Sequence, residues 1–117
     1  MIHAAMLKLI QDCGEGVLVL VEGLAQDEFL RSRLTRPEVQ RQLGLMAGTL
    51  ASLSPAAQAA LPEIDWAGWR AITVVRGLPA EARDDALWFA ASALVPATLL
   101  WLRVYQQSQP ELFAFTA

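Results

Sequence analysis

The sequence is poor in the residues that build disulfide frameworks, zinc sites and proton-transfer centres. Its 117 residues include a single cysteine, Cys13, and a single histidine, His3. A lone cysteine excludes an internal disulfide framework and a cysteine-rich zinc site, which favours a cytoplasmic protein. A lone histidine leaves little for acid–base catalysis, because histidine is the side chain whose unperturbed pKa lies near neutral pH. We therefore expect neither a cofactor nor a bound metal ion.

Charged residues are also scarce, at 18% of the chain, whereas hydrophobic residues reach 55%. Such a chain has more apolar surface than a small monomer can readily bury, so we expect association, most simply as a symmetric homodimer. The net charge of −3 argues against broad electrostatic capture of nucleic acid. Positive charge is nevertheless concentrated in one stretch that contains Arg31, Arg33, Arg36 and Arg41. This stretch is either a solvated turn and helix start, or a patch for RNA or an acidic partner.

The length fits one domain, residues 1–117. The N-terminal residues lead directly into an amphipathic helix with Lys8 and Asp12, which is not the layout of a signal peptide. Gly14 and Gly16 lie inside this helical pattern and indicate a bend or a close approach by a neighbouring helix. No strand alternation competes with the helical periodicity.

Apolar residues at steps of three and four predict two long helices. The first helix carries Ile2, Met6, Leu9, Cys13, Val17, Leu20 and Leu24, and the second carries Val39, Leu43, Met46, Leu50 and Leu53. Thr35 and Glu38 have the spacing of a capping box at the start of the second helix. Ser54 and Asp65 are placed to begin two further helices, over residues 56–61 and 66–75. The predicted fold is an all-α, antiparallel bundle of four to five helices.

The last predicted helix, residues 80–107, raises the question of a membrane span. Residues 86–102 carry no charge, and the length of this uncharged run is at the short limit for a helix that crosses a bilayer. Pro96 lies near the middle of this run, Ser92 and Thr98 add polar atoms, and the flanks are not strongly basic. We therefore expect a buried central helix or a dimer-interface helix, with no membrane partner.

Several residues along the chain occur in an order that is typical of one family. They are Asp27-Glu28-Phe29-Leu30 with Thr35, Leu53-Ser54 leading to Pro62-Glu63-Ile64-Asp65-Trp66, then Trp69-Arg70-Ala71-Ile72, Arg76-Gly77, Trp88 and Pro96. Their order and spacing resemble the HepT-like members of the HEPN superfamily, small helical proteins that include ribonuclease toxins. The resemblance covers roughly residues 9–102. A glutamate that is usual on the family's second helix corresponds here to Gly48 or a neighbour.

The resemblance implies a homodimer whose arginine and histidine act on an RNA phosphodiester. It also implies a nucleotidyltransferase antitoxin that adenylylates a tyrosine of the toxin. In the family, four to six residues separate the arginine from the histidine, and one more separates the histidine from the tyrosine. Arg76 matches the arginine, but neither partner is present. The histidine position falls at Glu81, Ala82 or Arg83, and the tyrosine position at Arg83, Asp84 or Asp85.

The candidate catalytic residues are therefore Arg76 and Glu81. Arg76 would stabilise a phosphate or an oxyanion, and Glu81 would act as a base if desolvation raised its pKa. The competing interpretation makes Glu81 an ordinary acidic residue in a helix first turn, and pairs Arg76 with a nearby carboxylate. His3 would reach such a site only if the fold brought it there.

Three hypotheses follow. The first is a degenerate HepT-like protein of a toxin–antitoxin type system that acts by binding a protein partner such as a nucleotidyltransferase. The second is an active, metal-independent ribonuclease toxin that uses Arg76 with Glu81 or His3. The third is a structural or dimerisation module unrelated to RNA. The four tryptophans could offer stacking surfaces for bases, but tryptophans at helical spacing are more typical of a core.

Overall fold

The computed structural model of the protein describes residues 2–113, and within this range every regular element is helical. The α-helices are α1 (Ile2–Val21), α2 (Gln26–Arg31), α3 (Thr35–Ser52), α4 (Pro55–Ala59), α5 (Trp66–Thr73), α6 (Ala80–Phe89) and α7 (Val95–Ser108). Two 3₁₀ turns, η1 (Val75–Gly77) and η3 (Pro110–Phe113), and one π-helical segment, η2 (Ala90–Leu94), complete the order. The predicted all-α class is confirmed for these residues.

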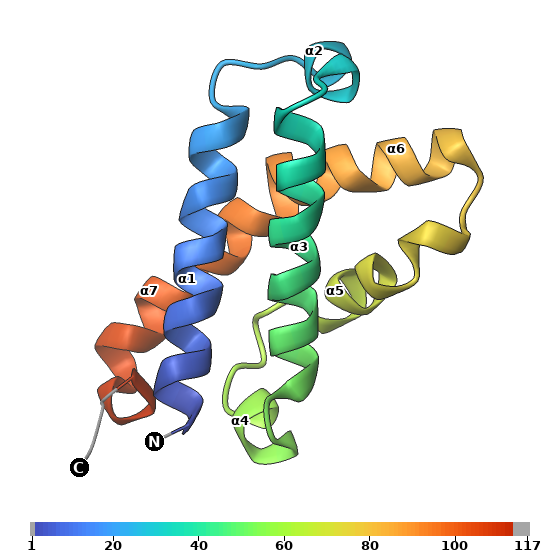
Figure 1. The fold of residues 1–117 in the computed structure, drawn as a ribbon. Helices are drawn as coiled ribbons and strands as arrows, with labels where there is room; N and C mark the ends of the chain where they lie inside the picture. The colour runs from blue at the N-terminus through green and yellow to red at the C-terminus, as the bar shows by residue number, and fades with distance from the viewer. Residues whose placement is uncertain (1, 114–117) are drawn as a thin grey trace.

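Helices α1 and α3 form an antiparallel pair, with α5 packed on α3 and α7 packed on α1, while α6 extends away from the pair (Figure 1). The predicted apolar seam of α3 is confirmed, because Val39, Leu43, Met46, Leu50 and Leu53 are all buried. The predicted stripe of α1 is partly wrong. Its buried line includes Leu7, Ile10, Cys13 and Val17, whereas Leu9 is 42% exposed. The difference arises because α1 is covered by α3 on one side and by α7 on another, so its buried face is wider than one stripe.

The predicted helix starts agree with the structure at Ser54 and Asp65 but not at Thr35. The Ser54 hydroxyl accepts from the Ala57 N–H at 3.1 Å, and the Asp65 carboxylate accepts from the Gly68 N–H at 2.8 Å. Thr35 instead lies inside α3, and its own N–H donates to the Ser32 hydroxyl at 2.9 Å. Leu34 directly precedes α3 and makes no side-chain cap, so the hydroxyl that accepts from the first turn of this helix comes from Ser32 and not from Thr35.

Residues 80–108 form one helical run that changes its hydrogen-bonding pattern in the middle. In η2 the Val95 N–H donates to the Ala90 carbonyl, five residues back, directly before Pro96. Proline has no N–H to donate, and the wider turn adjusts the helix at the point where one bond is missing. The inner face of this run packs on α1 and α3 through Leu94, Val95 and Leu102.

The outer face of the same run remains apolar and exposed. Phe89, Leu100 and Val104 keep 52%, 58% and 43% of their surface, and the exposed Ala93 and Ala97 lie between them. A helix buried on all sides is therefore wrong for the single chain. By length and composition the run is also apolar enough to cross a membrane: an 18-residue window within it has a mean hydropathy of 1.6, and 44% of that window is buried. The core helix of a soluble protein meets the same criterion.

Three long-range hydrogen bonds hold α7 to the preceding part of the chain, one to α5 and two to the connection between α4 and α5. The Trp69 indole N–H donates to the Thr98 hydroxyl at 2.9 Å, in the core. The Tyr105 hydroxyl donates to the Glu63 carboxylate and accepts from the Glu63 N–H at 2.9 Å. Burial and the Glu63 carboxylate raise the pKa of Tyr105 to about 12. Leu112 and Phe113, in η3, pack against the core.

The two glycines of α1 should respond in opposite ways to alanine. A Cβ at Gly14 would lie 2.8 Å from Leu99 Cδ2, which confirms the predicted close approach, whereas a Cβ at Gly16 would meet nothing within 4 Å. Gly16→Ala should raise the free energy of unfolding by roughly 0.5–1 kcal/mol through helix propensity. Gly14→Ala should lower it, because overpacking costs about 1–3 kcal/mol. Urea denaturation followed by circular dichroism measures both, and equal effects at the two sites would contradict the packing of α1 on α7.

Candidate functional site

Arg76 lies in η1 and lines a cleft of about 550 Å³ between α3, α5 and α6. The buried residues Val75 on η1 and Ile72 on α5 anchor the turn, and Arg76 itself is exposed. The wall formed by α3 includes Gly44 and Gly48, beside which an added Cβ would meet nothing within 4 Å. The floor is apolar, and the polar lining consists of Gln40, Arg41, Thr73 and Arg76. This volume lies within the usual range for binding pockets.

A second hollow of about 130 Å³ shares Ala47 and Thr73 with the first and continues along α3 and α5. It is lined by Trp66, Trp69 and Arg70, together with Gln58 near its end. We call the two hollows together the α3–α5 groove. Among the residues that the structure describes, neither a carboxylate nor a histidine lines either part. The groove therefore combines an apolar floor with arginines at its edge.

Sequence reasoning missed Arg70 as a groove residue. Trp66, Trp69, Arg70 and Thr73 stand at positions i, i+3, i+4 and i+7 of α5, which places them on one side of that helix. This spacing could have found Arg70, but the partner surface on α3 could not be known from α5 alone. No salt bridge involves Arg70 or Arg76 among residues 2–113.

Of the two predicted catalytic residues, only Arg76 lines the groove. Glu81 is exposed in the first turn of α6 and is not part of the groove lining. The predicted ion pair of Arg76 with a nearby carboxylate is not formed among residues 2–113. Asp84 pairs with Arg36, and Asp85 accepts from the Gln26 amide at 3.0 Å. Both carboxylates are thus engaged by the α2–α3 region rather than by η1.

His3 lies at the other end of the molecule from Arg76. Its Nε2 is 3.1 Å from the Ser54 hydroxyl, at the start of α4. Figure 1 shows α4 beside the N-terminal end of α1, far from the turn between α5 and α6. His3 is therefore a neighbour of a helix cap and not of the groove.

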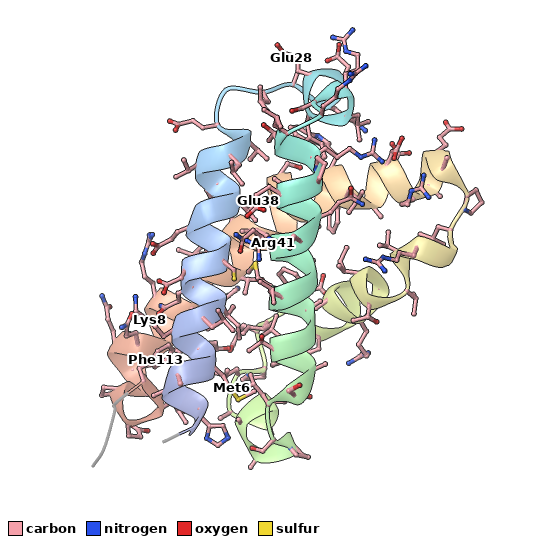
Figure 2. The ribbon with its side chains drawn as sticks, viewed as in Figure 1. Met6, Lys8, Glu28, Glu38, Arg41 and Phe113 are labelled. Carbon is pink, nitrogen blue, oxygen red and sulfur yellow. The ribbon has the colours of Figure 1, made fainter. Side chains whose placement is uncertain are left out.

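The basic stretch is mostly neutralised by ion pairs within the chain. Arg31 pairs with Asp27 at 3.2 Å, and Arg36 reaches across to Asp84. Arg41 binds both oxygens of Glu38, at 2.9 and 2.7 Å, and the Gln42 amide donates to the same carboxylate at 2.8 Å. Together these hydrogen bonds lower the pKa of Glu38 to about 2. Figure 2 shows Glu38 and Arg41 close together on α3. The stretch is therefore not one free basic patch.

Arg41 borders both α1 and the groove. It is part of the groove lining, but its guanidinium is held by Glu38, and its charge also acts on the pKa of Cys13 in α1. Burial is the larger effect on Cys13 and raises the pKa of its thiol. Arg70 and Arg76, which are in no salt bridge among residues 2–113, thus supply the free positive charge of the groove.

The other candidates from the sequence have structural roles. Trp69 is buried, and Trp66, Trp88 and Trp101 pack against the core while remaining half-buried. Glu63 binds Tyr105 and Asp65 caps α5. Within residues 2–113, no three histidine, cysteine, aspartate or glutamate side chains gather closely enough to hold a metal ion.

Comparisons of this chain with protein-family models, with curated proteins and with solved structures give no match. The features that bear on function are the α3–α5 groove, the exposed apolar face of the last helical run, and the family resemblance of the sequence.

Proposed function

We propose that this is a degenerate HepT-like protein with a HEPN-like arrangement of helices, which acts in the cytoplasm by binding a protein partner rather than by catalysis. The observation that carries the proposal is the composition of the α3–α5 groove. It has exposed, unpaired arginines at Arg70 and Arg76 but no histidine or carboxylate in its lining. Such a groove can bind a negatively charged group, but it offers no group to move a proton.

Metal-independent cleavage of RNA needs a base to take a proton from the attacking hydroxyl and an acid to protonate the leaving oxygen. His3 contacts Ser54 at the other end of the molecule, and Glu81 lies outside the groove lining. Arg76 alone could stabilise the charge of a phosphate. The alternative of an active toxin would therefore require a second group that this arrangement does not provide.

Regulation by adenylylation is also disfavoured. The chain has one tyrosine, Tyr105, and its side chain is buried, with the hydroxyl engaged by Glu63. A nucleotidyl group would need an exposed hydroxyl. If the partner is a nucleotidyltransferase, as the resemblance implies, we expect it to bind this protein without modifying a tyrosine.

The proposal includes a homodimer formed through the outer face of the last helical run. Phe89, Leu100 and Val104 form an exposed row with alanines between them, which suits close packing of two copies of one helix. A hollow of about 450 Å³ beside Pro96, between η2 and the end of α1, extends this face toward Val19. Val19 is 71% exposed. Two copies related by a two-fold axis would cover the same surface on each chain.

The purified protein is expected not to cleave labelled RNA in the presence of EDTA, and Arg76→Ala should behave identically. The reason is that the groove lacks a proton-transfer group. Gel analysis of the RNA over time gives the measurement, with Arg33→Ala as a control for an exposed arginine outside the groove. RNA cleavage that Arg76→Ala abolishes would refute the proposal and favour the active toxin.

The dimerisation module remains a separate alternative. It predicts the same lack of RNA cleavage, but no partner protein. The degenerate HepT-like protein is favoured if a nucleotidyltransferase encoded beside this gene co-purifies with it. The same complex should then form when the two proteins are purified separately and mixed. Absence of such a neighbouring gene favours the module.

A further inference from the structure

The α3–α5 groove differs in charge from the rest of the chain. The protein contains 12 acidic and 9 basic residues, yet no acidic residue lines either hollow of the groove. Four of the basic residues, Lys8, Arg31, Arg36 and Arg41, are held in salt bridges. Arg70 and Arg76 are in none of these pairs, and both are exposed at the groove.

The floor of the groove is made by core side chains. Leu43, Ile72 and Leu87 lie under the larger hollow, and Trp69 lies under the smaller one. The two hollows share the lining residues Ala47 and Thr73 and therefore lie next to each other, with Arg76 at the larger one and Arg70 at the smaller one. The groove therefore offers apolar contact along its length and a guanidinium in each part.

This combination favours a peptide over a nucleic acid. Nucleic-acid surfaces carry many cations so that they contact several phosphates, whereas two free arginines beside an apolar floor suit carboxylates next to apolar side chains. A guanidinium can bind a carboxylate through two parallel hydrogen bonds. The net charge of −3 would also repel an extended polyanion.

We propose that the α3–α5 groove binds an acidic amphipathic segment of a partner protein, with carboxylates on Arg70 and Arg76 and apolar side chains against the floor. This inference rests on the proposed function, since it identifies the surface through which the protein would bind its partner. It also specifies which side chains the partner segment must carry, namely carboxylates and apolar groups.

Selection of short random peptides, displayed on phage, against the immobilised full-length protein tests the groove directly. The expected result is enrichment of peptides that combine aspartate or glutamate with leucine, phenylalanine or tryptophan. A fluorescein-labelled copy of one enriched peptide is then titrated by fluorescence anisotropy. Arg70→Glu and Arg76→Glu should each weaken its binding roughly tenfold or more.

The matched control is Arg33→Glu, which makes the same change in net charge at an exposed arginine outside the groove. It should leave peptide binding almost unchanged. A peptide in which lysine replaces one glutamate should regain affinity for the charge-reversed groove variant. This rescue would show a direct charge contact, because a variant that had merely lost its fold would not be rescued.

Enriched peptides without acidic residues would overturn the inference, as would binding that is equally weakened by Arg33→Glu. Tighter binding of an unstructured single-stranded RNA, sensitive to Arg70→Glu and Arg76→Glu, would assign the groove to nucleic acid instead. These outcomes are separate from the RNA cleavage test. If RNA is not cleaved and the peptide selection fails, only the assignment of the groove is lost.

Discussion

Trp69→Ala is expected to lower the free energy of unfolding by roughly 3–5 kcal/mol, a large part of the about 5–15 kcal/mol typical of a domain. Trp69 is 2% exposed, and it fills the core between α5 and the last helical run. Its removal leaves a large cavity and also breaks the hydrogen bond to Thr98. Urea denaturation of the two proteins, followed by far-ultraviolet circular dichroism, measures the difference.

Two further variants separate packing from hydrogen bonding. Thr98→Val keeps the volume but leaves the buried Trp69 indole N–H without a partner, which costs about 1–3 kcal/mol. Trp101→Ala removes a half-buried tryptophan from the surface of the core and should cost less than Trp69→Ala. A loss below about 1 kcal/mol for Trp69→Ala would contradict its position in the core.

Leu100→Glu is expected to convert the proposed homodimer into a monomer. Leu100 is 58% exposed in the single chain, and it lies in the middle of the outer apolar row of the last helical run. A leucine that becomes buried contributes about 1.5–3 kcal/mol, and a two-fold dimer contains two copies. The dissociation constant should therefore rise by at least roughly a hundredfold. Size-exclusion chromatography with light scattering, over a range of concentrations, gives the mass of each species.

Leu34→Glu is the matched control, because Leu34 is 86% exposed in the connection between α2 and α3. It introduces the same charge without touching the outer face, and should leave the dimer intact. Circular dichroism of both variants checks that the fold is retained. A wild-type protein that stays monomeric at high concentration, or a dimer that persists in Leu100→Glu, would refute the proposed interface.

Features set by neighbours in the sequence were predicted well. The capping roles of Ser54 and Asp65 and the seam of α3 follow from contacts within one or two helical turns. The cap predicted for α3 was wrong because Thr35 lies inside the helix, and the hydroxyl that accepts from its N–H belongs to Ser32, three residues earlier. The short helix α2 was not predicted as a helix, and its Phe29 is buried in the core.

The candidate site was less predictable, because its composition depends on residues far apart in the chain. Arg76 was found from the sequence, but its predicted partners were nearby carboxylates. Asp84 is instead bound by Arg36, 48 residues away. Arg70 gains its role only because α5 packs along α3 and leaves a groove between them. Neither relation is encoded in a local pattern.

The sequence by itself determined the all-α class, most helix boundaries, the core seam of α3 and the shortage of groups for acid–base catalysis. These depend on helical periodicity, on capping side chains and on composition, all of which act over short distances along the chain. Only the tertiary structure decided which charges are paired, which arginines line the groove, and that His3 and Glu81 lie outside it. Those outcomes depend on which helix faces are brought together, and the same local pattern is compatible with several packings.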